Sequence, residues 1–149
     1  MPCACSSSRS GEPNAAAGAA SSTVGCQRSD GDSYTPGLKK SGAAGRFDFT
    51  LLSSTPAPPA LNDNLFVVQV SDQAGNPVSG ELSVALDMPE HGHPSPTQPD
   101  ISFDPERKAF VLDPMQLFMV GLWRITFSFD GADGGTRISD SAVFEFCIE

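Results

Sequence analysis

The stretch Trp123-Arg-Ile-Thr-Phe-Ser-Phe129 alternates large apolar residues with polar ones along its whole length. A period of two places the apolar side chains on one face of a β-strand and the polar ones on the other. The same alternation recurs in residues 47–51, 82–86 and 144–148, with Gly-, Pro- and Asp-rich turns between the runs. We therefore expect an all-β protein with an immunoglobulin-like antiparallel β-sandwich of about seven strands.

The N-terminal part of the chain has a different composition. Residues 1–41 are rich in small and polar residues, as in Asn14-Ala-Ala-Ala-Gly-Ala-Ala-Ser-Ser22. Such a segment buries too little apolar surface to offset the entropy lost on ordering. We expect residues 1–41 to be a disordered tail or linker and residues 42–149 to form the β-sandwich domain. The tail is either a plain extension or the remnant of an export or lipoprotein segment, with Cys5 or Cys26 as the lipid-bearing residue.

Composition excludes several classes of function. The 149 residues carry a formal net charge of -9, and residues 47–106 contain no Lys or Arg. Nucleic-acid binders normally show a clustered basic patch, so we expect no nucleic-acid partner. No run approaches the roughly 20 apolar residues that a membrane-spanning helix needs, which leaves a lipid anchor as the expected route to a membrane. Nucleophile elbows and HExxH motifs are missing, so we do not expect an enzyme.

The cysteines predict a disulfide bond rather than a zinc site. None of the four belongs to a CxxC pair, the spacing typical of structural zinc. If Phe144 and Phe146 face the core, Cys147 faces outward, where an N-terminal segment crossing the sheet can bring Cys26. We predict a Cys26–Cys147 disulfide and hence an oxidising compartment, with two free thiols as the alternative. The four cysteines are Cys3, Cys5, Cys26 and Cys147.

The densest group of chemically distinctive residues is Met88-Pro-Glu-His91-Gly-His93. Met88 continues the inward face of the preceding strand, while the glycine between the two imidazoles allows them to approach each other. A thioether beside two imidazoles favours copper over magnesium or calcium, which prefer oxygen ligands. Met119 is a candidate fourth ligand at the rim of the sheet, opposite Met88. The alternatives are methionines that only fill the core, a solvated turn, and a structural hydrogen bond between Glu90 and His91.

Two motifs together resemble the YtkA-like family of small bacterial exported or lipoprotein domains, which is related in pattern to FixH. They are the Met88–His93 stretch and Leu117-Phe-Met119-Val-Gly-Leu-Trp123, and the resemblance covers roughly residues 34–149. It implies an immunoglobulin-like sandwich, export, and a link with copper handling or oxidase assembly. The matched ligand positions are Met88, His91, His93 and Met119, with Gly121 and Trp123 as structural partners. Val120 departs from the family, which often has proline there.

Two functional hypotheses follow from these observations. The first is an accessory domain, exported to the periplasm or cell envelope and tethered there if lipidated, that binds copper through Met88, His91, His93 and Met119. Its expected partner is an envelope protein that donates or accepts the metal. The second is a structural or protein-interaction module without a metal, whose His-Gly-His loop is a recognition loop. Its acidic surface would favour a basic partner. The sequence does not assign an oligomeric state.

Overall fold

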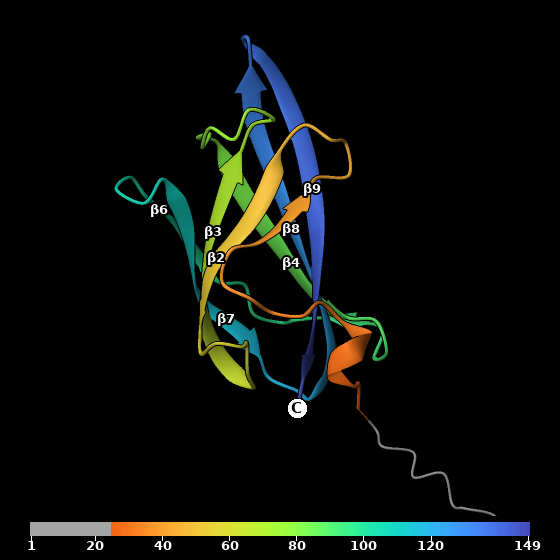
Figure 1. Ribbon diagram of the computed structural model, residues 1–149. Coiled ribbons are helices and arrows are strands. Elements are labelled where there is room, and N and C mark those ends of the chain that lie inside the picture. Colours follow the sequence, from red (N-terminus) through yellow and green to blue (C-terminus); the bar gives the residue numbers. More distant parts are fainter. Residues whose placement is uncertain (1–24) are drawn as a thin grey trace, which may run out of the picture.

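Two antiparallel β-sheets face each other in the computed structural model, which describes residues 25–149 (Figure 1). The five-stranded sheet has the order β1-β2-β3-β7-β6, and the four-stranded sheet has the order β5-β4-β8-β9. A short 3-10 helix, η1 (Arg28–Asp30), precedes the strands. The strands are β1 (Leu38–Ser41), β2 (Asp48–Thr55), β3 (Asn62–Ser71), β4 (Glu81–Met88), β5 (His93–Pro94), β6 (Asp100–Asp104), β7 (Ala109–Leu117), β8 (Gly121–Asp133) and β9 (Thr136–Ile148).

The strand order confirms the predicted immunoglobulin-like sandwich. β2-β3-β7-β6 and β4-β8-β9 reproduce the ABED and CFG sheets of a constant-type immunoglobulin domain. These seven strands are the runs that alternate in the sequence. β1 and β5 extend the two sheets by one edge strand each, so the described residues form nine strands rather than about seven.

Regular secondary structure is present before residue 42, so the expected boundary at residue 41 is wrong. β1 lies inside the predicted tail and pairs with β2, with Leu38 opposite Leu51. Leu38 packs against the core, and the backbone of β1 supplies hydrogen-bond partners to the edge of β2. Composition misses this segment because its ordering depends on contacts with distant residues. The part of the prediction that concerns residues 1–24 lies outside the described residues.

The core is built from the inward faces of both sheets. β8 contains the alternating stretch 123–129 from which the fold was predicted. Its apolar side chains are almost completely buried: Trp123, Ile125, Phe127 and Phe129. Aromatic rings meet edge to face across the core, as in the Phe66–Phe146 pair with ring centroids 6.4 Å apart. Such pairs add about 0.5–1.5 kcal/mol beyond the burial of their area. This rigid core fixes the loops at both ends of the sandwich.

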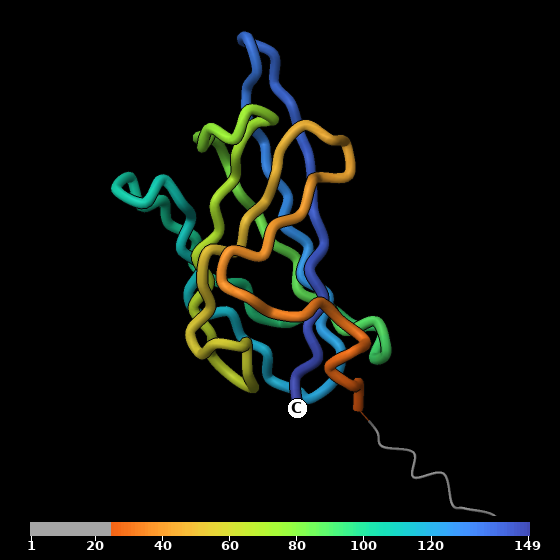
Figure 2. The backbone as a smooth tube through the Cα atoms, in the orientation of Figure 1, coloured from red at the N-terminus to blue at the C-terminus, as the bar shows by residue number. Residues whose placement is uncertain are grey.

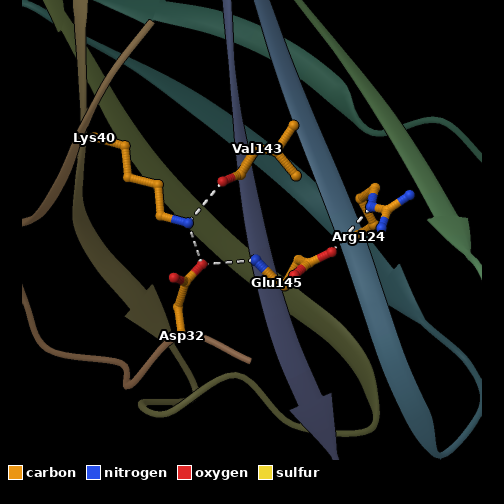
Figure 3. A network of polar contacts seen from close by, with 5 residues as sticks. All are labelled: Asp32, Lys40, Arg124, Val143 and Glu145. Atoms are coloured by element: carbon orange, nitrogen blue, oxygen red, sulfur yellow. Dashed lines mark hydrogen bonds and ion pairs between the residues drawn. The ribbon is translucent and has the colours of Figure 1, made fainter. Parts of the chain in front are cut away.

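The N-terminal segment runs along the outer edge of β9 and covers it; we call residues 26–37 the strap. The Asp32 backbone N–H donates to the Glu145 carbonyl at 2.6 Å, and the Glu145 N–H donates to Asp32 Oδ2 at 2.8 Å. Lys40 Nζ donates to Asp32 Oδ2 at 2.6 Å and to the Val143 carbonyl at 2.8 Å (Figure 3). These contacts satisfy backbone groups of an edge strand that would otherwise be open to pairing with another chain.

Gly31 provides a direct test of the strap. A Cβ at this position would lie 2.6 Å from the Glu145 backbone oxygen, while the backbone of Gly31 is extended and suits any residue. Because the clash is with backbone, Gly31→Ala is expected to lift the strap and lower the free energy of unfolding by about 1–3 kcal/mol. Urea unfolding measures the loss, and faster amide exchange at Glu145 locates it. Gly25→Ala is the matched control, since a Cβ there meets nothing within 4 Å; an equal loss in both variants would contradict the role of the strap.

Candidate metal centre

The His-Gly-His motif forms the turn of a β-hairpin between β4 and β5. The Met88 carbonyl accepts hydrogen bonds from the His91 and Gly92 N–H groups, both at 3.0 Å, and Met88 is the direct cross-strand partner of His93. Gly92 has φ +66°, a left-handed conformation that a turn needs and glycine adopts without strain. The glycine thus closes the hairpin and leaves the two imidazoles exposed on either side of it.

The two imidazole rings lie close enough to share a metal ion. Their centroids are 5.9 Å apart and their planes are inclined at 42°. Metal–nitrogen bonds of about 2 Å place the centroids of two ligating imidazoles roughly 5–6 Å apart. His93 Nδ1 lies 3.3 Å from the Pro94 carbonyl, which can only accept, so this contact is a hydrogen bond in the tautomer with the proton on Nδ1. The lone pair is then on Nε2, the arrangement in which a backbone carbonyl orients a metal-ligating histidine.

The Met88 side chain projects from the inward face of this hairpin, as its position in β4 predicts. It is fully buried and belongs to the core. Directly opposed residues of an antiparallel pair project from the same face, with Cβ atoms about 5 Å apart. Met88 and His93 are therefore neighbours across the β4–β5 pair. The Met88 methyl group, Cε, reaches the start of β8, where it contacts Gly121.

Met119 lies in the loop between β7 and β8, at the same end of the sandwich. Its side chain is partly buried against the core, and its carbonyl accepts a hydrogen bond of 2.8 Å from Trp123 Nε1. Met115 lies on β7, four residues before Met119. It is fully buried and only fills the core. Gly121 links the loop to Met88, because it follows Met119 by two residues and touches the Met88 methyl group. The structure thus unites Met88, His91 and His93 on one hairpin and places the loop of Met119 beside them.

The charged groups around the hairpin supply no larger ligand cluster. Within residues 25–149, no three His, Cys, Asp or Glu side chains form a group that could hold a metal ion. Glu90, which one alternative makes a hydrogen-bond partner of His91, has its Oε2 3.8 Å from a Cβ built on Gly121.

The predicted Cys26–Cys147 disulfide is present, with Cα atoms 5.6 Å apart. Cys147 pairs with Leu122 on β8, so the bridge lies beside the start of that strand and the Met119 loop. Val120 and the Gly25–Arg28 segment line a shallow pocket of about 520 Å³ between them. Figure 2 shows residues 25–30, the hairpin and the C-terminus at one end of the sandwich.

Sequence reasoning missed a groove at this end. It has a volume of about 710 Å³ and lies between the strap, the loop after β2 and the end of β9. Its walls include Tyr34, Pro56, Pro58, Pro59 and Phe146. The proline run of residues 56–59 was the available signal in the sequence. It lines a groove only together with the strap, and the composition of the strap does not predict that it is ordered.

Comparison with known proteins gives no family assignment. No protein-family model, curated protein or solved structure matches the chain. The resemblance to the YtkA-like family therefore remains a hypothesis that rests on the two motifs quoted above. Within residues 25–149, no helix is long and apolar enough to cross a bilayer.

Proposed function

We propose that this protein is an exported, non-catalytic accessory domain that binds copper at the β4–β5 hairpin. The observation that carries the proposal is the pair of exposed imidazoles with ring centroids 5.9 Å apart on one turn. His91 and His93 are the nitrogen ligands, and Met88 and Met119 are the thioether donors from below the hairpin and from the neighbouring loop. Metal handling or oxidase assembly of the YtkA-like kind is the proposed context.

The donor set and the disulfide support copper and export. Imidazole suits Cu(I), Cu(II) and zinc, whereas thioether sulfur selects Cu(I). Thioethers do not form disulfides, so they suit a compartment in which cysteines are oxidised. The Cys26–Cys147 bridge is compatible with such a compartment. The proposed location is the periplasm or cell envelope, where a partner protein would donate or receive the metal and a lipid on the N-terminal segment would act as a tether.

Competitive titration with Cu(I), Cu(II) and Zn(II) tests this proposal. The background is the full chain with Cys3→Ser and Cys5→Ser, because a Cys-Ala-Cys sequence would itself capture Cu(I). We expect one copper ion per chain, bound more tightly than zinc. His91→Ala/His93→Ala should lower the affinity for Cu(I) and the affinity for Cu(II) each at least about 100-fold, since the double substitution removes every histidine of the chain. Met88→Leu/Met119→Leu, which conserves volume, should weaken Cu(I) more than Cu(II).

Met115→Leu is the matched control for the methionine variant, because Met115 is a fully buried core methionine on β7, in the other sheet from the hairpin. It should leave both copper affinities unchanged. Zinc binding as tight as copper, or copper binding that survives loss of both histidines, would overturn the copper proposal.

A specific observation favours the second candidate, a protein-interaction module without a metal. The loop beside the hairpin exposes Phe118 and Val120, which retain 37% and 48% of their accessible surface. Leu61, which precedes the pairing of Asn62 with Leu117, is exposed at the same end. Apolar side chains that gather on a loop are typical of a contact surface. If copper binding fails, this end of the sandwich is the surface on which a partner search should begin.

A further inference from the structure

Gly121 occupies a position that leaves no room for a side chain. It is the first residue of β8, it is buried, and its φ of +133° lies outside the range that other residues readily adopt. A Cβ built on Gly121 would lie 2.7 Å from Met88 Cε and 3.8 Å from Glu90 Oε2. The space over this glycine is thus filled by the terminal methyl group of Met88, one bond from the Met88 sulfur.

The backbone around Gly121 is held on both sides, so Met88 is the element that would give way. Trp123, which is fully buried, donates its indole N–H to the Met119 carbonyl at 2.8 Å and packs edge to face against Phe118 at 5.3 Å. On the other side, Gly121 pairs with Ile148 in the β8–β9 ladder. The Met88 side chain, by contrast, rotates about unbranched bonds. A methyl group at position 121 would therefore displace the end of Met88.

We propose that Gly121 is a positioning residue for the Met88 thioether and thereby sets the preference of the hairpin for Cu(I). By lacking a side chain it seats the Met88 methyl group over β8 and fixes the sulfur in its place beneath the hairpin. His91 and His93 lie on the exposed turn, and neither is within 4 Å of a Cβ built on Gly121, so binding of Cu(II) by the imidazoles depends less on this position. This proposal rests on the proposed function, and its test separates the two.

The first test needs no metal. In protein labelled with ¹³C at the methionine methyl groups, Gly121→Ala is expected to move the Met88 methyl resonance, which Met88→Leu identifies by its loss. Gly75→Ala is the matched control, since Gly75 has φ +84° in the turn between β3 and β4 and a Cβ there meets nothing within 4 Å. It also places alanine at a positive φ, but at the other end of β4 from Met88. An unmoved Met88 resonance in Gly121→Ala overturns the proposal.

The second test is a double-mutant cycle of copper affinity in the Cys3→Ser/Cys5→Ser background. Gly121→Ala should lower Cu(I) affinity about 10-fold and Cu(II) affinity less, and it should have no further effect on Cu(I) once Met88 is leucine. A merely structural glycine would lower both affinities together, whether or not Met88 is present. A wild-type chain that binds no copper overturns the proposed function, and the role of Gly121 in it. A chain that binds Cu(I) through Met88 with unchanged affinity in Gly121→Ala overturns this proposal alone.

Discussion

Replacement of Asp140 by alanine is expected to lower the free energy of unfolding by about 2–4 kcal/mol, because it removes hydrogen bonds to a charged group and leaves a buried donor unpaired. Asp140 is 6% exposed. Its Oδ1 accepts from the Ala44 N–H at 2.7 Å and from the Ser141 N–H at 2.9 Å. Its Oδ2 accepts from the N–H groups of Arg46 at 2.8 Å and Phe47 at 3.0 Å. Alanine would leave these donors without their acceptor, and the Phe47 N–H is buried.

Asp72→Ala is the matched control for this substitution. Asp72 also accepts backbone N–H groups, those of Ala74 and Asn76 at 2.9 Å, but it does so in an exposed turn where water replaces the lost acceptor. Urea unfolding at pH 7 should therefore show a much smaller loss for Asp72→Ala than for Asp140→Ala. Equal losses would mean that burial of the Asp140 carboxylate is not the source of its effect.

The deficit of the Asp140 variant is expected to depend on pH. Burial raises the pKa of Asp140, but the hydrogen bonds from Ala44, Phe47, Arg46 and Ser141 outweigh burial and hold its pKa below the usual value. A lowered pKa in the folded state stabilises the protein above the unfolded value of about 3.9, and this contribution is lost as the pH falls toward the folded value. The difference in unfolding free energy between wild type and Asp140→Ala should thus be constant above about pH 5 and shrink below pH 4. A difference that grows on acidification would contradict this assignment.

Asp140 also shows where sequence reasoning about the fold ends. Period-two alternation located the strands of the sandwich because each buries one face, and face burial is a local pattern. Three of the four N–H groups that Asp140 accepts belong to residues more than 90 positions away in the chain. In the same way β1 and the strap are ordered by contacts with β2 and β9, and their small and polar residues give no sign of it. Contacts of this kind arise from topology, which the alternation does not encode.

The candidate site was predictable to a similar extent. The spacing of His91 and His93 placed both imidazoles on one turn, and strand parity placed Met88 on the buried face, as the structure has them. The position of the Met119 loop required the pairing of β8 with β4 and β9, which spacing along the chain does not give. The left-handed hairpin glycine was readable from the motif, whereas the contact of Gly121 with Met88 needed coordinates. Coordination of a metal by these residues stays a prediction for the titrations to decide.

Removal of the Cys26–Cys147 bridge is the second change with a large expected effect. In a background with Cys3→Ser and Cys5→Ser, which prevents exchange with other thiols, Cys26→Ser/Cys147→Ser should lower the unfolding free energy by about 2–5 kcal/mol. The bridged residues are separated by 121 positions, so the bridge closes almost the whole described domain into one loop. The loop-entropy model gives about 5 kcal/mol for a loop of this size, the upper end of that range. Urea unfolding of the bridged and serine proteins measures the difference.

Amide exchange at Glu145 then tells how the bridge acts. If the bridge stabilises the protein by restricting the unfolded chain, the strap stays seated in the folded serine variant, because Asp32 still pairs with Lys40 at 2.6 Å and accepts from the Glu145 N–H. Protection of the Glu145 amide should then fall by no more than the loss in global stability. A larger fall would show that the bridge itself holds the strap on β9. An unchanged unfolding free energy would contradict a stabilising role for the bridge altogether.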